Sequence, residues 1–155
     1  MKRRYTQLAV SAGLAVCLAA CNTKTIYDSF EHIDTNGWER GDTLCFTIPS
    51  LESAGTYTEQ VGLRTTGLYP FMSLTLIVEQ TIFPLGKTLS DTIVCHLTNA
   101  NGTSLGRGIS TFQYDFDVRV LNLYKADSIS VSIHHHMRRE VLPGIVDVGF
   151  QVSKE

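Results

Sequence analysis

Several features that define common protein classes are missing from this sequence of 155 residues. It contains no low-complexity segment and no internal repeat. Beyond residue 20, no apolar run approaches the roughly 20 residues that a membrane-spanning helix needs. The same stretch lacks convincing amphipathic helix patterns. Residues 21–155 therefore suffice for one domain with its own core, and not for two.

Basic residues are too few to suggest a nucleic-acid partner. The sequence has 13 Lys and Arg residues against 15 Asp and Glu residues, and three of the basic ones lie at positions 2–4. Without the first 20 residues, 10 basic and 15 acidic residues remain, which is a net charge near −5. A negative chain is repelled by phosphate groups. We therefore expect no nucleic-acid partner, and no binding to anionic headgroups through net charge.

The N-terminus has the pattern of a secretory signal peptide. Lys2, Arg3 and Arg4 form a positive start, and an uncharged, mainly apolar run follows from Leu8 to Ala20. That run is too short to span a bilayer as a helix and matches the apolar region of a signal peptide. We therefore predict that residues 1–20 are a signal peptide.

The residues before Cys21 distinguish lipidation from ordinary secretion. Leu18–Cys21 (LAAC) resembles a lipobox, in which an apolar and two small residues precede the cysteine that receives lipid. Cys17 competes less well because β-branched Val16 precedes it, and a plain signal peptide with a chance cysteine is the alternative. We predict lipidation of Cys21, a lipidated tether over 21–24 and a folded domain over 25–155. Two or more acyl chains, such as palmitate, would then confine the protein to a membrane.

The remaining chain is rich in strand signals. β-Branched and aromatic residues occur in runs separated by Gly, Pro, Asn and Asp. The predicted strands are 25–33, 43–48, 57–65, 71–79, 88–97, 118–124, 128–137 and 145–152. The last has the clearest alternation, with one face formed by Val146, Val148, Phe150 and Val152. This spacing predicts an all-β fold, a single antiparallel β-sandwich, and leaves the choice between jelly-roll and Ig-like strand order open.

Two cysteines, Cys45 and Cys95, remain in the predicted domain. Outside the cytoplasm a disulfide between them is allowed. It would require a Cα separation below about 7 Å, which the sequence does not determine. Two separate buried thiols that behave as small apolar groups are the alternative.

The run of three histidines at 134–136 is the main metal-binding candidate. On a strand, His134 and His136 face one way, about 6.5 Å apart, which suits two ligands of one metal. A third ligand would have to come from elsewhere, and His32, His96 and Asp147 are equivalent candidates. A strand end that turns into solvent is the favoured interpretation. We therefore predict no metal site and no other cofactor.

No catalytic residue is predicted, so the chain is not expected to be an enzyme. Gly102–Gly106 (GTSLG) matches the G-x-S-x-G pattern of a hydrolase nucleophile, but no helix pattern follows it, as that motif requires. Asp115 and Asp117 have the spacing of a carboxylate pair, yet nothing indicates that either is buried. Trp38, the sole tryptophan, is expected to fill one end of the core rather than to stack on a sugar.

Several segments in order resemble the GldH family of gliding-motility lipoproteins. We call them the family segments: Cys21 with its signal peptide, Trp38-x-x-x-Asp42 with Phe46, Tyr57, Leu63-Arg64, Tyr69-Pro70-Phe71, Asp91-Thr92, Gly102 with Leu105-Gly106-x-Gly108, His136-Met137-Arg138, Leu142-Pro143-Gly144-Ile145 and Asp147-Val148-Gly149. The resemblance covers essentially the whole predicted mature chain. Its C-terminal part is the most specific.

The resemblance implies a non-enzymatic accessory protein of gliding or secretion-linked envelope machinery, with envelope protein partners. Gly144 and Gly149 suit turns or close backbone approach, and Arg64, Arg138 and Asp147 suit ion pairs at strand ends. An envelope carbohydrate-binding sandwich that uses Trp38 and Tyr69 is the alternative function.

The expected location is the cell envelope, on the outer membrane facing the periplasm. Surface-exported lipoproteins of such bacteria resemble one another in having acidic residues soon after the lipidated cysteine. Here none occurs between Cys21 and Asp28.

Overall fold

The structure is a computed structural model that describes residues 24–155. This part contains strands and no helix, so no described helix is long and apolar enough to cross a membrane. The strands are β1 (Lys24–His32), β2 (Trp38–Glu39), β3 (Leu44–Ile48), β4 (Gly55–Thr66), β5 (Ser73–Phe83), β6 (Lys87–His96), β7 (Thr111–Leu123), β8 (Ser128–His135), β9 (Val141–Leu142) and β10 (Ile145–Lys154).

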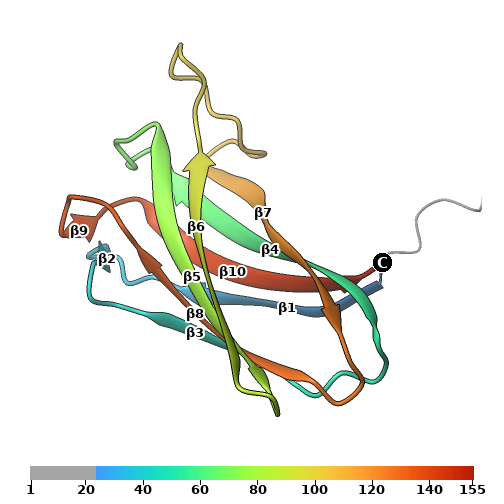
Figure 1. The fold of residues 1–155 in the computed structure, drawn as a ribbon. Coiled ribbons are helices and arrows are strands. Elements are labelled where there is room, and N and C mark those ends of the chain that lie inside the picture. The colour runs from blue at the N-terminus through green and yellow to red at the C-terminus, as the bar shows by residue number, and fades with distance from the viewer. Residues whose placement is uncertain (1–23) are drawn as a thin grey trace, which may run out of the picture.

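Two four-stranded antiparallel sheets form the layers of a sandwich (Figure 1). Their orders are β1-β10-β4-β7 and β3-β8-β5-β6, and β2 pairs with β9 in a short separate ribbon. The first strand pairs with the last one, whereas an Ig-like order would place the first two strands side by side. Two sheets of four strands that interleave early and late strands are a jelly roll. The predicted all-β sandwich is confirmed, and the strand order decides the open choice.

The core lies between the sheets and follows the alternation in the sequence. Phe46 and Ile48 of β3 are buried together, and Val148, Phe150 and Val152 of β10 face them from the other sheet. The rings of Phe46 and Phe150 lie 6.1 Å apart between centroids. The predicted inward position of Val146 is wrong. A bulge between Ile145 and Asp147 instead makes Ile145 the first buried residue of the strand.

The predictions differ from the structure at three strands, β7, β2 and β9. β7 begins at Thr111 rather than at 118. The prediction missed its first half because the polar residues Gln113, Asp115 and Asp117, which occupy the outer face, resemble a loop in the sequence. β2 and β9 have two residues each and were not predicted. Their pairing depends on contacts between distant parts of the chain, which a local pattern does not contain.

The two cysteines of the domain are unpaired. Cys95 is fully buried on the inner face of β6, and burial raises the pKa of its thiol to about 12. Cys45 is exposed on β3, so the alternative of two buried thiols is right for Cys95 and wrong for Cys45.

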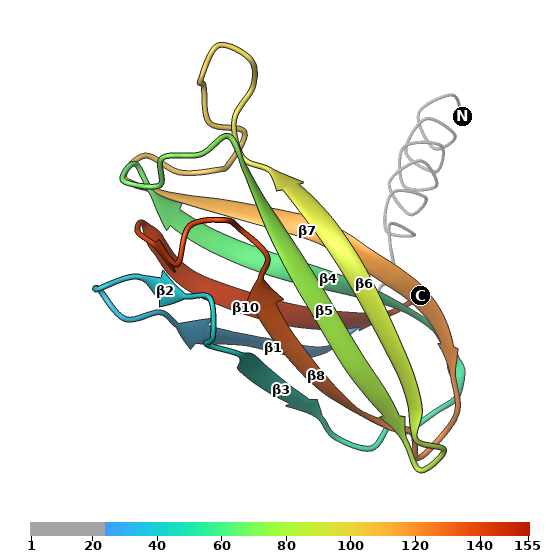
Figure 2. The same cartoon turned by 60° about the vertical axis from the view of Figure 1, so that its left-hand side comes forward.

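The connections gather at two ends of the sandwich (Figure 2). The proximal end contains Lys24, the C-terminus, the 49–54 loop and the turns at 84–86 and 124–127. The distal end contains the loops 33–43, 67–72, 97–110 and 136–144, together with the β2–β9 ribbon.

Candidate functional surface

Most of the family segments that lie in loops come together at the distal end. They are separated by more than half the chain, yet the jelly roll returns each of them to the same end (Figures 1 and 2). We define the distal surface by the segments that meet there: 37–42, 67–72, 97–110 and 136–144.

Trp38 anchors one side of this surface and is only 1% exposed, which confirms that it fills the core. Its indole Nε1 donates a hydrogen bond to the carbonyl of Asp42, 3.1 Å away, which explains the Trp38-x-x-x-Asp42 spacing. A buried indole offers no face to a sugar ring. The carbohydrate-binding alternative therefore loses its main support, which was an exposed Trp38 ring.

His135 lies between the two candidate metal ligands, His134 and His136, and is the buried member of the histidine run. Its Nε2 donates to the carbonyl of Trp38 at 3.2 Å, and its Nδ1 accepts the amide of Met137 at 3.4 Å. Burial lowers the pKa of His135, which keeps the imidazole neutral and suits this pattern of one donor and one acceptor. Both ring nitrogens are thus engaged in holding the end of β8 against β2.

His134 and His136 do not converge with further ligands. His136 is exposed beyond the end of β8, and His32 instead contacts Asp147 on the opposite sheet. Within residues 24–155, no group of three His, Cys, Asp or Glu side chains is placed to hold a metal ion.

The segment around Gly144 contacts the β4–β5 loop. Gly144 has a φ of +79°, and a Cβ there would lie 2.3 Å from the amide nitrogen of Tyr69. Its carbonyl accepts the amide of Thr66 at 2.8 Å. The predicted close approach at Gly144 is confirmed. The Tyr69 hydroxyl donates to the carbonyl of Ser73 at 2.9 Å, so Tyr69 is a structural part of this loop.

The 97–110 loop is attached to the same region by its own hydrogen bonds. The amides of Leu97 and Thr98 both donate to the carbonyl of Met72, at 2.8 and 3.2 Å. The hydroxyls of Ser104 and Tyr114 lie 2.7 Å apart, and the Ser104 oxygen accepts the amide of Gly106 at 3.1 Å. No helix follows Ser104 in the described chain, so the geometry is that of a loop rather than a hydrolase nucleophile.

A row of polar side chains crosses the outer face of the β1-β10-β4-β7 sheet beside the distal surface. His32 Nδ1 lies 2.9 Å from Asp147 Oδ1, and Arg64 Nη1 lies 3.3 Å from Asp147 Oδ2. Arg64 Nε donates to Gln113 Oε1 at 2.8 Å, and Gln113 Nε2 donates to Asp115 Oδ1 at 3.1 Å. The predicted ion pair between Arg64 and Asp147 is confirmed.

The other predicted charges behave differently. No ion pair of Arg138 occurs among the described residues, and its carbonyl accepts a hydrogen bond from Arg40. Asp117 accepts from Gln60 Nε2 at 2.7 Å, and Asp115 pairs with Arg107, so these carboxylates are held by neighbours on the outer face.

Gly149 lies under this polar row and confirms the second predicted close approach. The Phe30 ring lies across Gly149 and Gly62, where a Cβ on Gly149 would come within 2.7 Å of the ring. The Arg64 guanidinium covers the other side of the ring, 4.1 Å from its centroid. A cation over an aromatic face adds an attraction to this packing.

The distal surface exposes large apolar side chains that the sequence patterns did not reveal. Ile109 is 95% exposed and Leu68 75%, and Leu105 and Met72 are also exposed. Arg138 and Arg139 are exposed on the 136–144 loop. Exposure of isoleucine and leucine side chains to water costs free energy that burial in an interface would recover. Aromatic, Met and Arg side chains are enriched in protein interfaces. This arrangement suits contact with another protein. The sequence did not reveal these exposed apolar residues, because they lie in loops among many polar neighbours and only the fold brings them together.

Cys21 and residues 1–20 lie outside the described residues. The lipidation site, the signal peptide and the tether therefore stay predictions.

Comparison with known proteins confirms the resemblance to the GldH family. A family model described as GldH lipoprotein matches residues 25–152. The chain is 31% identical over 153 residues to "Gliding motility lipoprotein GldH" of Flavobacterium johnsoniae, covering 91% of this chain and 92% of that protein. It is 29% identical to "Gliding motility lipoprotein GldH homolog" of Christiangramia forsetii, covering 90% of each.

Among solved structures, the globular domain of zebrafish complement 1qA protein has a TM-score of 0.45 at 15% identity, covering 84% of this chain and 96% of that one. The family model over residues 25–152, together with 31% identity to a relative over 91% of this chain, shows that the chain belongs to the GldH lipoprotein family.

Proposed function

We propose that this protein is a lipid-anchored, non-enzymatic accessory of gliding or secretion-linked machinery in the cell envelope. Membership in a lipoprotein family supports a lipid-anchored position there, and the relatives' names supply the link to gliding motility. Cys21 is the proposed site of the lipid. The protein would act by holding a partner protein near the membrane.

One observation supports the distal surface as the place of contact. The loops that contain family segments converge there, and exposed Leu68, Leu105 and Ile109 project from the same loops. Backbone hydrogen bonds at Met72 and Gly144 hold those loops to one another. A preformed surface binds with less loss of conformational freedom than a flexible one.

Site-specific photo-crosslinking in intact cells tests this proposal. A photoreactive amino acid at Leu105 or Ile109 is expected to give a discrete crosslinked product with an envelope protein. The same residue at Val120, an exposed apolar position on β7 outside the distal surface, is the matched control. Products of equal yield from all three positions, or from none, would contradict the proposal.

A pair of substitutions that place charges on the apolar surface connects contact to function. Leu105→Asp with Ile109→Asp is expected to remove the crosslinks and to impair motility or secretion, while Val120→Asp leaves both unchanged. All variants must reach wild-type abundance, which is expected because the side chains are exposed. Wild-type function in the double variant would rule out the distal surface.

We also propose that the protein faces the periplasm from the outer membrane, because no acidic residue occurs between Cys21 and Asp28. Protease added to intact cells is then expected to leave the protein whole and to cleave it only after the outer membrane is permeabilised. Cleavage in intact cells would place it on the cell surface instead.

A further inference from the structure

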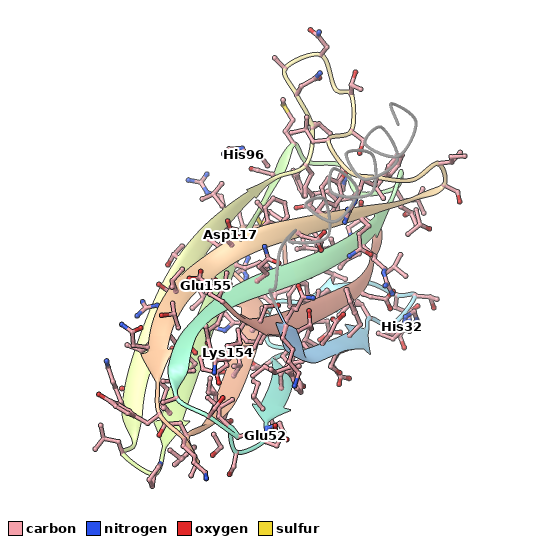
Figure 3. All side chains as sticks on the ribbon, turned by 90° about the vertical axis from the view of Figure 1, so that its right-hand side faces the viewer. His32, Glu52, His96, Asp117, Lys154 and Glu155 are labelled. Atoms are coloured by element: carbon pink, nitrogen blue, oxygen red, sulfur yellow. The ribbon has the colours of Figure 1, made fainter. Side chains whose placement is uncertain are left out.

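The lysines of the described chain all lie at the proximal end. They are Lys24 at the start of β1, Lys87 at the start of β6, Lys125 in the β7–β8 turn and Lys154 at the end of β10. Lys24 and Lys154 are register partners on adjacent strands. Figure 3 shows Lys154 and Glu155 close together near the middle of the view, with Glu52 below them and with His32 and His96 toward the edges.

The acidic surplus of the domain lies elsewhere. Among the 15 acidic residues, those in the proximal loops and strand ends are Glu52, Asp127 and Glu155, which four lysines roughly balance. The other twelve acidic residues outnumber the six described arginines by two to one. The net charge that argues against anionic headgroups is therefore a property of the whole chain and not of this end.

Exposed apolar side chains lie beside these lysines. Leu85 in the β5–β6 turn is 84% exposed, Tyr124 in the β7–β8 turn is 73% exposed, and Phe83 is half-exposed. Leu85, Lys87 and Tyr124 line one groove of about 420 Å³. A second cleft of about 470 Å³ has Lys24 and Lys154 in its lining, together with apolar residues of β1 and the 49–54 loop.

We propose that the proximal end of the sandwich lies on the bilayer that holds the Cys21 lipid, with Leu85, Phe83 and Tyr124 at headgroup depth. This inference rests on the proposed lipidation of Cys21. Only three residue steps separate Cys21 from Lys24, and an extended chain of that length reaches about 10 Å. The start of β1 must therefore lie close to the membrane surface.

The chemistry of this end matches a membrane interface. Tyrosine is enriched at headgroup depth, and lysine side chains extend along apolar surfaces while their ammonium groups reach phosphates. Attraction to anionic lipids adds to the burial of apolar area. In this orientation the distal surface, at the other end of the strands, points away from the membrane and toward a partner.

Depth-dependent fluorescence quenching tests the orientation. The mature lipidated chain is reconstituted in phosphatidylethanolamine–phosphatidylglycerol vesicles, with bromine on the acyl chains as the quencher. Leu85→Trp reports on the proximal end and Leu105→Trp is the matched control at the distal end. Buried Trp38 contributes the same background to both.

The added emission of Leu85→Trp is expected to shift to shorter wavelength and to be quenched severalfold more than that of Leu105→Trp. Introducing Lys87→Glu and Lys125→Glu into Leu85→Trp, or omitting phosphatidylglycerol, should reduce this quenching. Equal quenching at both positions, or none at Leu85→Trp, would overturn the orientation if mass spectrometry shows lipid on Cys21. Absence of lipid on Cys21, with no flotation of the protein on vesicles, would instead overturn the proposed anchoring on which the orientation rests.

Discussion

Glu59 has a carboxyl group buried in the middle of the sandwich. Replacing it by Glu59→Gln tests how much the burial of this ionisable group costs in unfolding free energy. The side chain points inward from β4 between Tyr57 and Val61 and is fully buried. Its Oε2 accepts a hydrogen bond of 2.9 Å from Gln80 Nε2 on the opposite sheet. Glu59 Oε1 and Gln80 Oε1 have no hydrogen-bond partner among the described residues. Both are acceptors, so a proton on Glu59 supplies a donor that the pair lacks.

Burial raises the pKa of Glu59 from 4.5 to about 7, and the hydrogen bond from Gln80 and the charge of Arg119 oppose that rise only in part. The folded state therefore binds a proton that the unfolded state has released between these two values. The contribution of Glu59 to stability is therefore greatest below pH 4.5 and falls as the pH rises toward 7. The difference between the two pKa values corresponds to about 3 kcal/mol of unfolding free energy.

A neutral amide of nearly the same shape avoids the cost of burying a charge. We expect Glu59→Gln to increase the unfolding free energy at pH 8 by about 2–3 kcal/mol and to change it little near pH 5. Urea unfolding at several pH values, on chains with Cys21→Ser so that no lipid is attached, measures both effects. Exposed Glu79 on β5 is the matched control, and Glu79→Gln should leave the pH dependence intact.

Two results would refute this reasoning. One is a stability loss between pH 5 and pH 8 in Glu59→Gln that equals the loss in the parent chain. The other is an equal gain at pH 8 from Glu79→Gln.

Packing and thiol exposure supply two further predictions. Gly149→Ala places a methyl group against the Phe30 ring and should lower the unfolding free energy by about 1–3 kcal/mol. Gly41→Ala, where a Cβ meets nothing within 4 Å, should change it by less than about 0.5 kcal/mol, and equal losses in urea titrations would contradict the packing argument. In the folded chain a thiol reagent should modify exposed Cys45 quickly and buried Cys95 only after denaturant is added. If mass spectrometry shows that the reagent modifies Cys45 and Cys95 at the same rate, the prediction is wrong and the core around β6 opens readily.

The sequence predicted the strands where apolar and polar residues alternate. β10 and β3 were recognised within a few residues because their inward side chains are Val, Phe, Ile and Leu. The first half of β7 was not predicted, because its outward Asp and Gln residues resemble those of a loop. β2 and β9 were not predicted either, since strands of two residues contain no period.

The buried carboxyl of Glu59 was not recognised either. It occupies an inward position of the pattern that contains Tyr57 and Val61, so alternation alone places it in the core. A glutamate is rarely buried without a partner, and its partner Gln80 lies on another strand of the other sheet. The polar pair is visible only when the two sheets are brought together.

For the candidate surfaces, the sequence identified the family segments and correctly predicted the ion pair of Arg64 with Asp147 and the close approaches at Gly144 and Gly149. It did not predict that separate segments share the distal end. It also did not predict that all described lysines share the proximal end.

The amino-acid sequence is sufficient to recognise the signal-like N-terminus with its LAAC segment, the all-β class and the face on which most strand residues lie. Tertiary structure decided which strands are neighbours, that β10 lies between β1 and β4, and therefore which loops meet at each end. The physical reason is that a period of two determines the face of each side chain, whereas strand order depends on contacts between residues far apart in the chain.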